Sequence, residues 1–200
     1  DEWYAAKAAN PAAVPPHDVR LSVFSGASAG AITAALATGY LASNQPPVTT
    51  EAEAASNNGR NKLFDSWVDR IDIVPLLGGR DLPEGKKVLS ALDSTILTEI
   101  ADSGLDVSPR GSRRPYVASD FHLLLTVTNL RGVPYEIKLI GSQHAGHPMS
   151  LHADYVHFAF GDAPPSTQPG CYPMAWSEFG NNAHPIKTKL KTTALASGAF

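Results

Sequence analysis

The feature that most constrains how this chain can fold is a serine flanked by glycines between two apolar segments. Residues 19–24 form a short apolar run with the length and composition of a buried strand. Residues 29–42 are rich in Ala and repeat larger apolar side chains four residues apart, which is typical of a helix. Between them, Gly26, Ser28 and Gly30 follow the pattern Gly-x-Ser-x-Gly. The sequence therefore predicts a strand, a sharp turn at the serine, and a helix.

This strand-turn-helix pattern is typical of a nucleophile elbow, in which a strained backbone presents the serine at the carboxyl edge of a sheet. Ser28 is the candidate nucleophile, and the small residues Gly26, Ala27 and Gly30 shape the elbow. A helix that begins at Ala29 directs its free N–H groups toward the serine, so the Ala29 N–H is the candidate oxyanion donor. The pattern alone leaves open an ordinary Gly/Ala-rich turn.

The rest of the chain predicts an α/β layer architecture in a single domain over residues 1–200, with a flexible connection around 43–60. Helices are expected at residues 3–9, 61–71, 89–103 (ended by Gly104) and 185–197. Alternating apolar residues predict strands at 123–128 and 135–139, joined by a hairpin turn at 129–132, and a further strand at 154–160.

Composition excludes several classes of protein. The formal net charge of -3 gives no basic surface for nucleic acid. No apolar run approaches the ~20 residues of a membrane span, and residues 1–4 lack the basic-then-apolar pattern of a signal peptide. A cytoplasmic or membrane-peripheral protein is favoured, although compartment and oligomeric state are not predicted. Cys171, the single cysteine, excludes an internal disulfide and is interpreted as an incidental thiol.

Residues 26–36 resemble the nucleophile block of patatin-like phospholipases. Residues 194–200 resemble a second block of that family, and residues 128–130 a third, so the resemblance spans about 19–200. It implies a patatin-like three-layer α/β/α fold with a central mixed β-sheet. It also implies a lipid acyl hydrolase of the phospholipase A or esterase type, which acts on lipid or phospholipid at a membrane surface. No cofactor and no metal are expected.

The resemblance implies a Ser–Asp dyad, in which an aspartate takes the proton of Ser28 and an acyl-enzyme forms. Two family features have no match in this chain. Residues 1–25 contain no Gly-rich oxyanion loop, and residues 78–80 (Gly-Gly-Arg) are interpreted as a plain turn. Residues 161–163 (Gly-Asp-Ala) have the wrong order and position for the aspartate motif. The aspartate is therefore expected beyond residue 200, and the sequence is expected to be incomplete at both ends and inactive in isolation.

Three alternatives remain open. An α/β-hydrolase with a Ser-His-Asp triad would use one of the downstream histidines. The density of histidines in residues 143–157 suggests a metal site, but their spacing does not place them on one face of a helix or strand. A non-catalytic patatin-like module would bind lipid or a protein partner through the apolar stripe of Leu63, Phe64 and Trp67, for which core packing is the competing interpretation.

Overall fold

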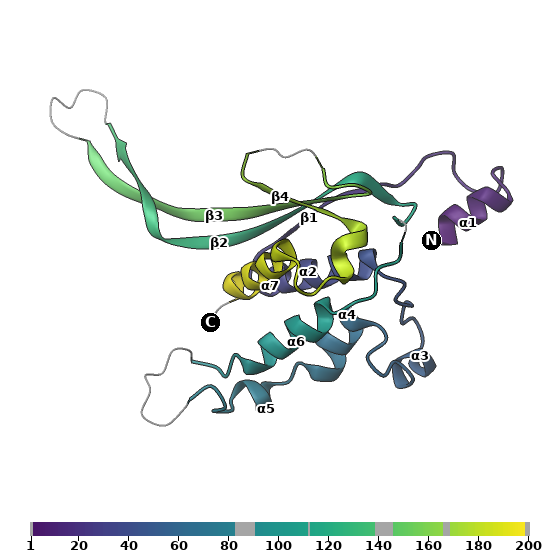
Figure 1. Cartoon of the computed structure of the whole chain (residues 1–200), viewed down its shortest axis with the longest axis horizontal. Coiled ribbons are helices and arrows are strands. Elements are labelled where there is room, and N and C mark those ends of the chain that lie inside the picture. Colours follow the sequence, from purple (N-terminus) through teal and green to yellow (C-terminus); the bar gives the residue numbers. More distant parts are fainter. Residues whose placement is uncertain (1, 83–90, 112, 139–145, 166–168, 199–200) are drawn as a thin grey trace.

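Four strands form one mixed sheet in the order β1-β2-β3-β4 (Figure 1). The computed structural model describes residues 2–82, 91–111, 113–138, 146–165 and 169–198. β1 pairs parallel with β2, β2 antiparallel with β3, and β3 parallel with β4. The α/β class and the mixed sheet are therefore confirmed. The strands are β1 (Leu21–Gly26), β2 (Val117–Ile137), β3 (His147–Gly161) and β4 (Cys171–Ala175).

The helices with strand contacts pack against one face of this sheet. In Figure 1, α2 and α7 lie directly beneath the strands, and α4, α5 and α6 lie beyond them. No described helix covers the opposite face. The helices are α1 (Glu2–Ala9), α2 (Ala29–Ala42), α3 (Glu51–Ala55), α4 (Lys62–Phe64), a π-helix η1 (Asp65–Arg70), α5 (Ile73–Leu76), α6 (Thr95–Leu105), a 3-10 helix η2 (Trp176–Gly180) and α7 (Pro185–Ser197).

The hydrophobic core fills the space between the sheet and the α2–α7 layer. Phe121, Leu123 and Leu125 alternate along β2 and are fully buried, and Phe158 and Phe160 of β3 meet them across the antiparallel pair. Because successive side chains of a strand point to opposite faces, this period of two gives β2 and β3 one apolar face toward the helices. The core therefore lies below β2 and β3, and β1, which leads into the candidate elbow, contributes the partly buried Leu21 and Phe24 to its edge.

The helix that follows the glycine-flanked serine has the predicted bounds, residues 29–42, and α7 has the predicted bounds 185–197. The prediction for residues 89–103 was less accurate, since α6 begins at Thr95 and residues 89–90 lie outside the described residues. Gly104 does not follow α6 but lies within it. A Cβ at Gly104 would stand 2.2 Å from Cδ2 of Leu36, so this glycine permits α6 to cross α2 closely.

The predicted hairpin turn at residues 129–132 was wrong, because β2 continues through these residues and pairs with β3 on both sides of them. A register shift between Thr128 and Val133 marks a bulge there. Asn129 Oδ1 accepts the N–H of Arg131, and Gly132 has a φ of 69°. The turn-forming residues therefore bend a continuous strand, and the family-like residues 128–130 lie inside it.

The connection predicted around residues 43–60 contains the short helix α3. Its N-terminus is closed by a capping box, in which Thr50 accepts the N–H of Glu53 and the Glu53 carboxylate accepts the N–H of Thr50. Further along, Asn57 and Asn61 are buried, and Asn57 Oδ1 accepts the N–H of Asn61 at 2.8 Å. The N–H of Lys62, the first residue of α4, donates to Gln45 Oε1 at 2.6 Å and so joins the start of α4 to the segment that follows α2.

Candidate active site

Ser28 lies at the junction of β1 and α2 in a strained backbone conformation. Its φ is 54° and its ψ is −127°. Among the described non-glycine residues, Asn58 is the other one with a positive φ. A side chain in this region costs about 1–3 kcal/mol and persists where the surrounding structure enforces it. The sharp turn predicted from the Gly-x-Ser-x-Gly pattern is therefore present, and the side chain of Ser28 is exposed at the carboxyl end of β1.

The two glycines of the pattern have different surroundings. A Cβ at Gly26 would lie 2.3 Å from the carbonyl oxygen of Gly30 and 2.8 Å from the nitrogen of Ala31. A Cβ at Gly30 would meet no atom within 4 Å. Gly26 is therefore required by the close crossing of strand and helix, as expected. Gly30 is not required for that crossing, because its position faces open space.

The first turn of α2 leaves a backbone donor free beside the serine. The N–H of Gly30 binds the carbonyl of Ala27 at 2.9 Å, and the N–H of Ala31 binds the carbonyl of Ser28 at 2.9 Å. The N–H of Ala29 has no hydrogen bond to any described residue. An unbonded N–H at the positive end of a helix is suited to stabilise an oxyanion. The predicted oxyanion donor is thus available for this role.

Ser197, near the end of α7, holds the elbow from the far end of the chain. Its Oγ accepts the backbone N–H of Ser28 at 3.0 Å. The neighbouring Gly198 allows close approach, since a Cβ there would lie 2.9 Å from Cδ1 of Ile32. The resemblance pointed to residues 194–200 as a block without giving Ser197 a role, and Ala199 and Phe200 lie outside the described residues. No sequence pattern predicts a hydrogen bond between two residues so far apart in the chain.

Residues 161–163, which were compared with the family's aspartate motif, contact another part of the chain. Asp162 forms an ion pair with Arg113, with Nε and Oδ2 3.3 Å apart. Within the described residues, no carboxylate is hydrogen-bonded to Ser28. The catalytic aspartate therefore stays a prediction for residues beyond 200.

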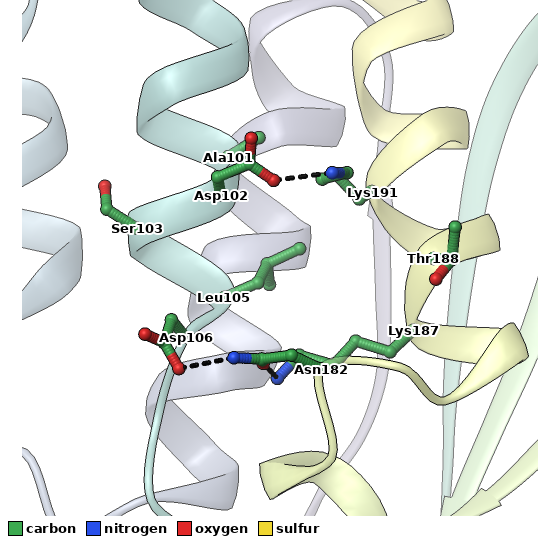
Figure 2. Close-up of a pocket in the computed structure, with 9 residues that line it drawn as sticks. All are labelled: Ala101, Asp102, Ser103, Leu105, Asp106, Asn182, Lys187, Thr188 and Lys191. Atoms are coloured by element: carbon green, nitrogen blue, oxygen red, sulfur yellow. Dashed lines mark hydrogen bonds and ion pairs between the residues drawn. The ribbon is translucent and has the colours of Figure 1, made fainter.

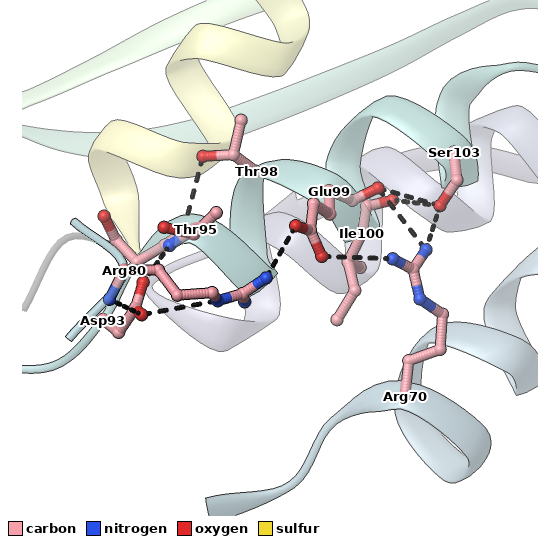
Figure 3. Close-up of polar contacts among 9 residues, drawn as sticks. Arg70, Arg80, Asp93, Thr95, Thr98, Glu99, Ile100 and Ser103 are labelled. Carbon is pink, nitrogen blue, oxygen red and sulfur yellow. Dashed lines mark hydrogen bonds and ion pairs between the residues drawn. The ribbon is translucent and has the colours of Figure 1, made fainter. Parts of the chain in front are cut away.

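The loop at residues 78–80 binds Asp93, as Figure 3 shows. The N–H of Arg80 donates to Asp93 Oδ2 at 2.8 Å, and the Arg80 guanidinium pairs with Glu99 of α6 at 3.0 Å. Hydrogen bonds, first from Thr95 and then from Arg80, hold the pKa of the buried Asp93 carboxyl below its ordinary value of 3.8. The loop anchors α6, which agrees with its interpretation as a plain turn.

The described histidines do not contact Ser28. His122 and His157 lie on the sheet face opposite the helices, with Nδ1 of His122 and Nε2 of His157 2.9 Å apart. His152 binds the carbonyl of Asn129, and His144 lies outside the described residues. Within the described chain no three His, Cys, Asp or Glu side chains gather as metal ligands.

Cys171 lies beside His157, to which it is paired across β3 and β4. Burial, with a further contribution from the charge of Asp120, raises the pKa of its thiol above the ordinary value of 9.0. A raised pKa leaves little thiolate at neutral pH, so this cysteine is a poor nucleophile. That agrees with its interpretation as an incidental thiol.

A polar cavity of about 360 Å³ between α6 and α7 contains a buried lysine (Figure 2). Lys187 is 4% exposed, and its Nζ donates to the carbonyl of Phe179 at 2.6 Å and to Asn182 Oδ1 at 2.5 Å. Burial lowers the pKa of Lys187, and the charge of Asp106 opposes this effect. Because its ammonium binds Phe179 of η2 and Asn182, the lysine joins the first turn of α7 to the loop that precedes it.

Comparison with known proteins gives one relative without an assigned activity. The chain is 38% identical over 223 aligned residues to "Uncharacterized protein y4iI" of Sinorhizobium fredii (strain NBRC 101917 / NGR234). The alignment covers 100% of this chain and 31% of the relative, so the chain spans about a third of that protein's length. No family model matches the chain, and no solved structure matches it. The catalytic role of Ser28 therefore stays a prediction.

None of the described helices combines the length and the apolar character needed to cross a bilayer.

Proposed function

We propose that this chain is part of a patatin-like lipid acyl hydrolase in which Ser28 is the nucleophile. The observation that carries the proposal is the strained backbone of Ser28 at the N-terminus of α2, beside the unbonded N–H of Ala29. A turn that only connected a strand to a helix would not need a serine with a positive φ at this position. The strain is explained if it exposes a reactive hydroxyl.

The proposed reaction begins when Ser28 Oγ attacks the carbonyl carbon of a lipid ester. The carbonyl oxygen gains negative charge and accepts the N–H of Ala29. When the tetrahedral intermediate collapses, the ester C–O bond breaks, the base passes the proton that it took from Ser28 to the leaving alcohol, and the acyl group stays on Ser28. Water then attacks the acyl-enzyme and releases the fatty acid. The base is an aspartate expected beyond residue 200, and a Gly-rich loop outside this chain would supply further oxyanion donors.

In this proposal the observed sheet is the central layer of a three-layer α/β/α fold. The described helices form the layer on one face of the sheet, and the opposite face would be covered by a second layer, as in patatin-like proteins. The substrate class is an ester of a lipid or phospholipid, taken from a membrane surface by a membrane-peripheral enzyme. The proposal requires no cofactor, because the hydroxyl and the backbone donors carry out the bond changes.

Labelling with a fluorophosphonate probe tests the role of Ser28. In the full-length protein we expect covalent labelling at Ser28 and hydrolysis of short-chain aryl esters. Ser28→Ala should abolish labelling and lower kcat/KM by at least about three orders of magnitude. Ser25→Ala, which changes an exposed serine of β1, is the matched control and should keep both activities.

Two results would contradict the proposal: no labelling of the folded full-length protein, or labelling that persists in Ser28→Ala. Replacement of each of the seven histidines by Ala separates a dyad from a triad, since a dyad enzyme keeps its activity in every case. The isolated 200 residues should show no turnover, and esterase activity of this chain that is lost in Ser28→Ala would contradict that expectation.

A further inference from the structure

An apolar hollow of about 540 Å³ opens at the first turn of α2, next to the candidate nucleophile. Ala29, Gly30 and Thr33 line it on the α2 side. The facing side is formed by side chains of α4 and η1 together with Val48 of the preceding connection. The same residue, Ala29, therefore borders both the hollow and the position expected for the oxyanion.

The side chains that face α2 across the hollow are large and apolar. They are Leu63, Phe64 and Trp67, the stripe that the sequence assigned either to core packing or to lipid binding. All three are half-buried, and Leu63 and Trp67 also rest against the hydrophobic core. Their inner parts are therefore held by the fold, while their outer parts remain available to a ligand.

The polar side chains of Thr33 and Asn61 at the hollow are already bound within the protein. Thr33 Oγ1 donates to the carbonyl of Ala29 at 2.8 Å. Asn61 Nδ2 donates to the carbonyl of Pro46 at 2.8 Å, and its Oδ1 accepts the N–H of Phe64 at 3.0 Å. Two donors at the hollow have no hydrogen-bond partner among the described residues: the N–H of Ala29, beside the position expected for the oxyanion, and the buried Nε1–H of Trp67. The remaining lining is mostly apolar, so the hollow favours a ligand that is apolar along most of its length.

We propose that this hollow holds the acyl chain of the ester that Ser28 attacks. This rests on the function proposed above. The acyl carbon becomes bonded to Ser28 Oγ while its oxygen faces the Ala29 N–H, so the chain attached to that carbon starts at Ala29. From there the adjoining apolar space lies between α2 and Trp67. Each methylene buried in it strengthens binding about three- to fourfold, so the hollow selects long acyl chains over short ones.

Gly30 is the position that keeps this hollow open. It lines the hollow, and a Cβ there would meet no atom within 4 Å, so a larger side chain can be added without a clash in the protein. Its φ is not in the positive range, so other residues can adopt its backbone conformation. Gly30→Val would therefore leave the elbow intact and fill the entrance to the hollow.

Two alkyl fluorophosphonates, one with an ethyl chain and one with a dodecyl chain, test the proposal in the full-length protein. The measured quantity is the ratio of the labelling rates at Ser28, dodecyl over ethyl. We expect the wild-type ratio to be well above one, and Gly30→Val to lower it at least tenfold because the dodecyl reagent reacts more slowly. Trp67→Ala should also lower the ratio, because it removes an apolar side chain from the side of the hollow that faces α2. The matched control is Leu130→Ala, an 88% exposed leucine in β2, which should keep the ratio.

The outcomes separate this inference from the proposed function. If neither reagent labels Ser28, the proposed function fails. If both label it and Gly30→Val leaves the ratio unchanged, the acyl site is overturned while the nucleophile stands. Binding of a long-chain fatty acid to the Ser28→Ala variant, measured by calorimetry, gives a readout without catalysis. Its weakening by added Gly30→Val would support the site, and unchanged binding would overturn it.

Discussion

The long hairpin of β2 and β3 has two halves that share a sequence pattern and differ in their surroundings. In the half near β1, Phe121 and Leu123 are 0% exposed beneath the sheet. In the other half, which extends beyond the helices in Figure 1, Val133 and Tyr135 are 57% and 44% exposed. Each pair alternates with other residues along β2, but the bulge between Thr128 and Val133 separates the two runs. Val133 pairs with Leu151, which is seven residues from Phe158 on β3, so the two pairs lie on opposite faces of the sheet. We call the second half, residues 129–137 and 147–155, the arm.

The comparison shows that alternation identifies the apolar face of a strand but not what covers that face. In the arm, Val133 is paired with Leu151 and Tyr135 with Met149, so their side chains form one continuous apolar face. Without α2 and α7, the apolar face of the half near β1 would also be exposed to solvent. Burial there depends on helices that come from distant parts of the sequence, and β2 itself does not encode it.

The largest predicted difference between the two halves concerns aromatic side chains. Phe121→Ala should lower the free energy of unfolding by about 3–5 kcal/mol, because it leaves a cavity in the packed core. Tyr135→Ala should change it by less than about 0.5 kcal/mol, because the side chain is 44% exposed and lies outside the packed core. Urea denaturation of both variants measures the difference. Similar losses would show that the arm is covered as firmly as the core.

The two glycines of the elbow, Gly26 and Gly30, also share a sequence pattern and differ in their surroundings. Gly26→Ala should destabilise the protein by about 1–3 kcal/mol, because its Cβ would overlap the carbonyl of Gly30. Gly30→Ala should be neutral or stabilise α2 by up to about 1 kcal/mol, because the position is open and Ala favours a helix. Thermal unfolding distinguishes them. Equal effects would contradict the described crossing of β1 and α2.

The smallest predicted effect concerns the sheet face opposite the helices. Burial first, and then the charge of neighbouring His122, lowers the pKa of His157 below its ordinary value of 6.5. The unfolded chain therefore binds a proton at His157 before the folded one does, and stability falls as the pH drops below about 6.5. His157→Gln should reduce this pH dependence, measured as urea midpoints at about pH 7.5 and 5.5. If the change in urea midpoint between the two pH values is the same in His157→Gln as in the wild type, His157 is as exposed to solvent as the side chains of the arm.

Local features of the fold could be predicted from the sequence. The bounds of α2 follow from an Ala-rich segment after a glycine turn, and the turn at Ser28 follows from the small residues around it. The bulge at Asn129 could not be predicted, because the same residues favour a hairpin turn when no neighbouring strand is known. Gly104 resembled a helix end for the same reason, since its need for space arises only from Leu36 of another helix.

The candidate site was predictable to the extent that it is local. Ser28 and Ala29 lie in one continuous motif, whereas the apolar stripe of Leu63 and Trp67 could be recognised but not placed. Its position beside α2 depends on the buried amides of the connection, Asn57 and Asn61, and polar residues in a loop do not reveal which side chains will be buried. Ser197 could not be assigned, since its role exists only once α7 has packed against α2.

The bond between the N–H of Ser28 and the hydroxyl of Ser197 also concerns protein synthesis. The two residues are 169 positions apart, so a ribosome that adds roughly 5–20 residues per second needs about 8–34 seconds to make the second after the first. During that interval the nascent elbow lacks this bond to its strained backbone. If Ser28 is reactive, its full reactivity would then appear only after α7 has been synthesised and has packed against α2.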